Sequence, residues 1–128
     1  MYYNFYGNGG TTLISRHAFY VVGTFVEGLP YADDYDFWLR WTLKHKLGME
    51  HIPKIVMNYR VHNESLTGKK NSTENAKLVA SLLEIYEPYL TDEDREYLKP
   101  MKVSLKKKVG RKIPIIGRTI RRIKRIWK

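Results

Sequence analysis

The apolar side chains of this chain recur at helical spacing in two separate stretches, and this periodicity limits the folds open to it. From about Asp33 to Lys46 they recur every three or four positions, and Gly48 then supplies a stop. This first stripe consists of Tyr35, Trp38, Leu39, Thr42, Leu43 and Leu47. The second, after a capping-box start at Asn71 and Glu74, consists of Leu78, Val79, Leu82, Leu83, Tyr86 and Tyr89. The pattern predicts an amphipathic helix in each stretch.

Shorter elements lie before, between and after these two stripes. Thr11-Thr12-Leu13-Ile14 has the composition of a short buried strand, and Ser15 is placed to cap a helix over Arg16–Val22 that Gly23 closes. The segment Met49–Arg60 is rich in strand-forming residues, with Pro53 marking a strand end or edge. Thr91 is expected to cap a further short helix that Pro100 ends. Strands and helices together predict a mixed α/β fold class.

The positive charge of the chain is confined to its C-terminal end. The formal net charge is +10, yet from Met101 onward there are 12 Lys or Arg residues and no Asp or Glu, whereas the first 100 residues hold 11 basic and 13 acidic residues. Such a block of like charge indicates a separate segment with its own partner. The absence of cysteine excludes disulfides and thiolate metal sites. Neither a signal peptide nor an apolar run long enough to span a bilayer is expected.

The basic C-terminal segment carries a helical pattern of its own. After Pro114, large apolar residues recur at helical spacing among lysines and arginines: Ile116, Ile120, Ile123 and Trp127. A cationic amphipathic helix of this kind is typical of an interfacial membrane helix, and each basic residue near an anionic surface contributes about 1 kcal/mol. We therefore expect 113–128 to bind an anionic membrane surface. Docking on a protein is the first alternative, and nucleic-acid binding through phosphates is the second.

Three carboxylates stand at the start of the first amphipathic helix, at Asp33, Asp34 and Asp36. Acidic residues in a first helical turn are stabilised by the helix dipole, so capping alone is one explanation. A carboxylate among other carboxylates also suits proton abstraction, since like charges raise its pKa. With a histidine nearby it could instead bind a divalent metal. Asp36 and Arg40 are four residues apart, which predicts an ion pair on the helix surface.

Four sequence blocks, in this order and spacing, resemble the acceptor half of family 2 glycosyltransferases of the GT-A fold. The blocks are Gly10–Arg16, Val22–Phe25, Ala32–Arg40 and Tyr59–Ser65, the third reading Ala-Asp-Asp-Tyr-Asp-Phe-Trp-Leu-Arg and the last Tyr-Arg-Val-His-Asn-Glu-Ser. The resemblance implies the C-terminal part of a mixed α/β GT-A domain with a helical, basic tail. It predicts an acceptor-side half over 1–70, a helical extension over 71–100 and the basic amphipathic tail over 101–128.

The resemblance also assigns roles to single residues. Asp34 matches the family's general base, which deprotonates the acceptor hydroxyl in an inverting displacement, and Asp33 stands beside it where glutamate is commoner. The resemblance places Asp33, Tyr35 and Trp38 on the acceptor side, although Trp38 also lies on the apolar stripe, which favours core packing. Arg60 matches a position that can contact the donor diphosphate. His62 matches a histidine that helps to hold a divalent metal (Mn or Mg).

The donor-binding half that the resemblance requires is not recognisable in this sequence. No βαβ pattern precedes Gly7, and no Asp-x-Asp stands in a predicted strand. We therefore expect a glycosyltransferase fragment that is inactive alone and needs a complementing half to bind the nucleotide-sugar. Its acceptor would be a glycan or a lipid-linked sugar of cell-surface polysaccharide biosynthesis, at the cytoplasmic face of the cell membrane. The alternative is a non-catalytic basic module of transferase ancestry that binds a membrane or a partner.

Overall fold

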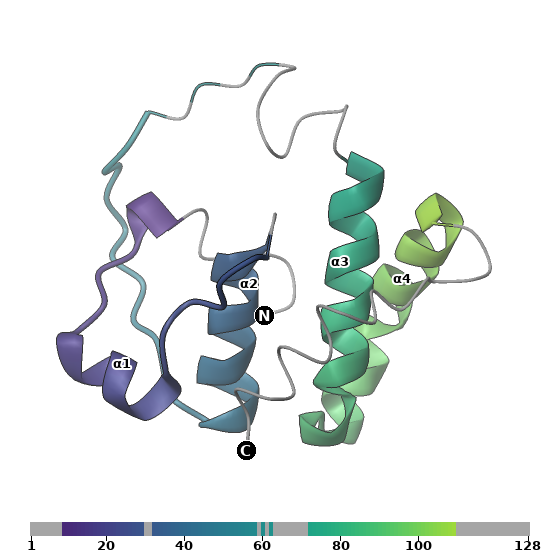
Figure 1. Cartoon of the computed structure of the whole chain (residues 1–128), viewed down its shortest axis with the longest axis horizontal. Helices are drawn as coiled ribbons and strands as arrows, with labels where there is room; N and C mark the ends of the chain where they lie inside the picture. Colours follow the sequence, from purple (N-terminus) through teal and green to yellow (C-terminus); the bar gives the residue numbers. More distant parts are fainter. Residues whose placement is uncertain (1–8, 30–31, 59, 61, 63–71, 110–128) are drawn as a thin grey trace.

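The computed structural model describes residues 9–29, 32–58, 60, 62 and 72–109, and these residues form helices joined by irregular segments. In chain order the elements are the 3-10 turn η1 (Gly9–Thr11), α1 (Arg16–Val22), α2 (Asp33–Leu39), the π-helical turn η2 (Arg40–Lys44), α3 (Ser72–Ile85), the 3-10 turn η4 (Glu87–Tyr89) and α4 (Asp92–Val109). Helix α2 lies between α1 and α3, and α4 packs against α3 (Figure 1).

The predicted mixed α/β fold of GT-A type is wrong, because the described ranges contain no strand. The predicted strand at Thr11–Ile14 begins as the last residue of η1 and continues as irregular chain. Residues 49–58 of the second predicted strand are irregular as well, and the side chain of Ile55 is 95% exposed. Strand-forming residues make a strand only when a neighbouring strand completes their backbone hydrogen bonds. No such neighbour lies beside these two segments in the described ranges.

The predictions for the first helices are confirmed at their starts. Ser15 caps α1, and its Oγ accepts a hydrogen bond of 3.3 Å from the amide of Ala18. Gly23 ends α1 with φ of +85°. Helix α2 begins at Asp33 as expected, but from Arg40 the coil widens into the π-helical turn η2, so regular helix stops before the predicted Lys46. There the hydroxyl of Thr42 donates to the Trp38 carbonyl at 2.8 Å, a contact that bends helices.

Helix α4 begins as predicted and ends later than predicted. Thr91 and Asp94 form a reciprocal capping box: the amide of Asp94 donates to Thr91 Oγ1 at 3.1 Å, and the amide of Thr91 donates to Asp94 Oδ2 at 2.8 Å. The predicted end at Pro100 is wrong, because α4 continues to Val109. An interior proline costs about 3 kcal/mol. Contacts on both sides of Pro100, by buried Leu98 and by the Lys102–Glu87 ion pair, fasten this part of α4 to the rest of the fold.

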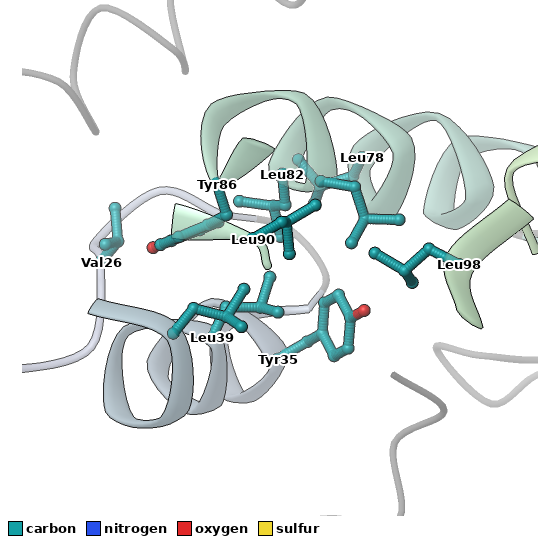
Figure 2. Close-up of a cluster of buried hydrophobic side chains, with 10 residues drawn as sticks. Val26, Tyr35, Leu39, Leu78, Leu82, Tyr86, Leu90 and Leu98 are labelled. Atoms are coloured by element: carbon teal, nitrogen blue, oxygen red, sulfur yellow. The ribbon is translucent and has the colours of Figure 1, made fainter. Parts of the chain in front are cut away.

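The main hydrophobic core joins three helices. Figure 2 shows Tyr35 and Leu39 of α2 pointing toward Leu82 of α3 and Tyr86 just after it, with Leu98 of α4 at the side. The complete buried cluster is Val26, Tyr35, Leu39, Leu43, Leu78, Leu82, Leu83, Tyr86, Leu90 and Leu98. It draws on both the predicted acceptor-side half and the predicted helical extension. The position of α2, and of the carboxylates at its start, is therefore set by α3.

A second buried cluster lies between α1 and α2. Its members are Val22, Phe37 and Trp38. The Phe37 ring lies 5.0 Å from Phe25, 5.5 Å from Phe19 and 5.1 Å from Trp38, the last edge to face. Such aromatic contacts stabilise a core beyond their buried area. Helix α2 is thus packed on two sides, by α1 and by α3.

Over the described ranges, no helix is both long enough and apolar enough to cross a membrane. The predicted amphipathic helix over 113–128 lies outside the described residues, as does the predicted cap at Asn71.

Candidate functional site

The carboxylates at the start of α2 differ in exposure. The side chain of Asp33 is exposed, Asp34 is half-buried and Asp36 is fully buried. Asp34 Oδ1 accepts a hydrogen bond of 2.7 Å from the amide of Tyr35, which ties the carboxylate to the first helical turn. The predicted cluster therefore separates into two accessible carboxylates and one that solvent does not reach.

The predicted ion pair between Asp36 and Arg40 is confirmed, but it is buried and not on the helix surface. Arg40 Nε and Nη2 both lie 3.0 Å from Asp36 Oδ2, and the Arg40 side chain is 3% exposed. The guanidinium also stands 5.3 Å from the centre of the Phe37 ring. A buried pair of this kind is costly to desolvate and is kept only when further hydrogen bonds complete it.

Arg40 completes its hydrogen bonds on the loop that follows α1. Its Nη1 donates to the Val22 carbonyl and its Nη2 to the Thr24 carbonyl, each at 2.8 Å. Between these two carbonyls stands Gly23, whose φ of +85° favours glycine and whose added Cβ would lie 3.2 Å from Arg40 Nη1. The backbone conformation thus favours glycine here, and an added Cβ would also press on the guanidinium.

Asp36 is held from the opposite side by Tyr86, the residue that directly follows α3. The Tyr86 hydroxyl donates to Asp36 Oδ1 at 2.7 Å, and neither side chain is exposed to solvent. Burial raises the pKa of Asp36, while the Arg40 charge and the Tyr86 hydrogen bond oppose that rise. Burial and the Asp36 carboxylate both raise the pKa of Tyr86, so the phenol stays protonated and donates. Asp36, Arg40 and Tyr86 form what we call the buried network.

The two predicted acceptor-side aromatic residues are both buried. Tyr35 is 7% exposed in the main core, where burial raises its pKa, and Trp38 is 4% exposed in the second cluster. The expectation that Trp38 packs in the core is confirmed. As these rings are packed, neither offers a face to a sugar, and their acceptor role stays a prediction that this geometry does not support.

Arg60 and His62 both lie in exposed, irregular chain beyond residues 49–58. In the described part of the chain, no group of three or more His, Asp or Glu side chains could hold a metal ion. The metal role of His62 and the diphosphate role of Arg60 stay predictions.

The roles of two residues of the site were not predicted from the sequence. Tyr86 is recognisable only as one more apolar position of the α3 stripe, and nothing local indicates that its hydroxyl reaches a carboxylate 50 positions away. Gly23 is recognisable as a helix stop, but its second role, as space for Arg40, depends on tertiary contact. The chain matches no protein-family model, no curated protein and no solved structure.

Proposed function

We propose that this chain is the acceptor-binding, base-carrying part of an inverting glycosyltransferase that takes its sugar from a nucleotide-sugar. The observation that carries this proposal is the division of the acidic cluster. Asp36 is buried and bonded on two sides, whereas Asp34, two residues earlier, is half-buried on the same turn. A catalytic base must be held in place and still reach its substrate. The ordered blocks that resemble family 2 glycosyltransferases support the same proposal.

In the proposed reaction, an acceptor hydroxyl attacks the anomeric carbon of the donor sugar. A new carbon–oxygen bond forms as the bond to the diphosphate breaks, and the nucleoside diphosphate leaves with the electron pair. The proton of the hydroxyl passes to the Asp34 carboxylate. Because attack and departure occur on opposite faces, the anomeric configuration inverts. The nucleotide-sugar itself would be held by a complementing polypeptide.

Complementation tests the role of Asp34. The full chain is combined with a nucleotide-binding half, sought in the coding region upstream, and sugar transfer is measured for the native chain, Asp34→Asn and Glu84→Gln. Glu84 is an exposed carboxylate on α3 and serves as the matched control. Loss of a general base lowers the rate about 10²- to 10⁴-fold. We expect this loss for Asp34→Asn and an unchanged rate for Glu84→Gln.

Undiminished transfer by Asp34→Asn would refute Asp34 as the base. If no nucleotide-binding segment is encoded upstream in any frame, the alternative of a non-catalytic module of transferase ancestry is favoured.

The tail carries a second proposal, that residues 113–128 bind an anionic membrane surface peripherally. The support lies in the sequence pattern of isoleucines at helical spacing among basic residues. Co-sedimentation with phosphatidylglycerol vesicles and with neutral phosphatidylcholine vesicles tests it on the full chain. We expect binding to the anionic vesicles only, and its loss when 113–128 is removed.

A charge-preserving variant separates the membrane from nucleic acid as the partner of the tail. In Ile116→Ser/Ile120→Ser/Ile123→Ser every lysine and arginine remains, so binding through phosphates alone persists. An interfacial helix needs its apolar face and loses vesicle binding. Vesicle binding equal to that of the native chain would contradict the membrane proposal.

A further inference from the structure

We propose that Tyr86 is a positioning residue for Asp34, which it holds in place through the buried network. This inference rests on the proposed function, since it concerns the same base. It extends the site to the residue that directly follows α3, a part of the chain that none of the four sequence blocks includes. The effect of Tyr86 on the proposed base passes through Asp36, whose carboxylate accepts the Tyr86 hydrogen bond.

The first step of the argument is the connection between Asp36 and the turn that carries Asp34. The amide of Asp36 donates to the Ala32 carbonyl at 2.9 Å, and this hydrogen bond closes the first turn of α2. Asp33 and Asp34 stand inside that turn. Contacts that restrain Asp36 therefore also restrain the backbone of the turn that contains Asp34.

The second step is that Asp36 is fixed from two separate parts of the chain. Arg40 binds Oδ2 and also donates to the carbonyls of Val22 and Thr24, while Tyr86, directly after α3, donates to Oδ1. Asp36 itself is fully buried. Replacing Tyr86 by phenylalanine would leave Oδ1 without this donor where water does not reach it, so the carboxylate must move or recruit another partner.

The third step concerns the residue at the entrance to α2. Ala32 has φ of +59° and ψ of +26°, a left-handed conformation that is unfavourable for alanine, and no side-chain cap stabilises the helix start. Such a conformation persists where the surroundings impose it. The buried network and the core contacts of Tyr35 hold the next turn of α2 in place. The left-handed conformation of Ala32 therefore depends on packing and not on the intrinsic preference of alanine.

The test compares two variants that each remove only a phenolic oxygen. Tyr86→Phe removes the hydroxyl that bonds Asp36, and Tyr20→Phe removes one from a side chain that is 81% exposed. Amide hydrogen exchange of the full chain, read by NMR, needs no substrate and no complementing half. A lost hydrogen bond to a charged group corresponds to an effect of about tenfold or more. We expect Tyr86→Phe to raise the exchange rate of the Asp36 amide about tenfold or more. The exchange rate of the Leu82 amide should stay within twofold of that in the native chain. Tyr20→Phe should change neither.

The same variants in the complementation assay separate positioning from a merely structural role. We expect Tyr86→Phe to lower kcat while the acceptor KM stays within twofold, because the base is misplaced but the acceptor contacts are not. Loss of folded protein would instead speed amide exchange throughout α3. Unchanged exchange at Asp36, or an unchanged kcat while Asp34→Asn is inactive, would overturn the inference and leave the proposed function intact. Full activity of Asp34→Asn would remove the proposed function and with it the role of Tyr86 in catalysis.

A second variant covers the case in which Tyr86→Phe does not fold. Gly23→Ala acts on the other side of the network, where the added methyl group would crowd Arg40 Nη1. We expect it to speed exchange of the Asp36 amide as well, since Arg40 must shift. Gly48→Ala is its control, because an added Cβ there meets nothing within 4 Å. Exchange at Asp36 that is equal in the two glycine variants would overturn the inference.

Discussion

The helices α2 and α3 and the segment 49–58 are all rich in apolar residues, but the helices bury most of theirs, whereas most of those in the segment are exposed. Leu82 in α3 is fully buried, whereas Ile52, Ile55 and Val56 are 62%, 95% and 68% exposed. A helix satisfies its backbone hydrogen bonds within itself, so its apolar face is free to pack. An extended segment needs a second strand before it can do the same. The difference follows from where each backbone finds its partners.

The buried network shows the same contrast for polar groups. Asp36 and Arg40 stand on neighbouring helical turns, and three further groups complete their hydrogen bonds: Tyr86, Val22 and Thr24. In the described part of segment 49–58, the backbone makes a local hydrogen bond from the Lys54 amide to the Ile52 carbonyl. Substitutions in the packed helices should therefore change the free energy of unfolding strongly, and substitutions in segment 49–58 should change it weakly.

The largest expected effect is that of Arg40→Met. Removing one partner of a buried ion pair leaves an uncompensated charge and costs about 3–5 kcal/mol. Urea denaturation followed by circular dichroism measures the loss. The double variant Asp36→Leu/Arg40→Met removes both charges and should recover part of the stability. A loss below about 1 kcal/mol for the single variant would contradict the burial of this pair.

A matched pair of core and segment substitutions tests the comparison directly. Leu82→Ala opens a cavity in the main core and should lower the free energy of unfolding by about 2–5 kcal/mol. Ile55→Ala removes a side chain that is 95% exposed, and its free energy of unfolding should stay within about 0.5 kcal/mol of that of the native chain. Both are measured by urea denaturation. Equal losses would show that segment 49–58 is packed in solution and would break the comparison.

The cap of α4 gives an intermediate effect. Thr91→Ala removes the oxygen that accepts from the Asp94 amide and should cost about 1 kcal/mol. Ser104→Ala, at an exposed position of the same helix, is the control and should stay within about 0.5 kcal/mol. A thermal unfolding midpoint shared by the two variants would argue against the capping box.

The smallest effect is that of the ion pair between Glu87 and Lys102. The Lys102 hydrogen bond and charge lower the pKa of Glu87, so the pair stabilises the fold above the ordinary carboxyl pKa. This contribution is lost as the pH falls through the lowered pKa. Both side chains are more than a third exposed, so Lys102→Met should cost at most about 1 kcal/mol at pH 7. The difference from Lys107→Met, at an exposed position, should vanish at low pH, and a difference that persists there would contradict this assignment.

Local pattern predicts much of the helical part of this protein. The Ser15 cap, the start of α2 at Asp33 and the Thr91 start of α4 follow from residues close in sequence, because caps and apolar stripes act within a few turns. The pairing of Asp36 with Arg40 follows from their spacing alone. Their burial does not, because it depends on Phe37, Tyr86 and the loop after α1.

The sequence by itself determined where helices begin, which faces are apolar and how charge is divided between the first 100 residues and the tail. Only the tertiary structure decided that α4 passes Pro100, that residues 49–58 form no strand, and that Asp36 lies inside while Asp34 stays partly accessible. Each of these outcomes depends on a partner distant in sequence. Spacing along a chain reports contacts within one element, whereas burial and strand pairing arise between elements.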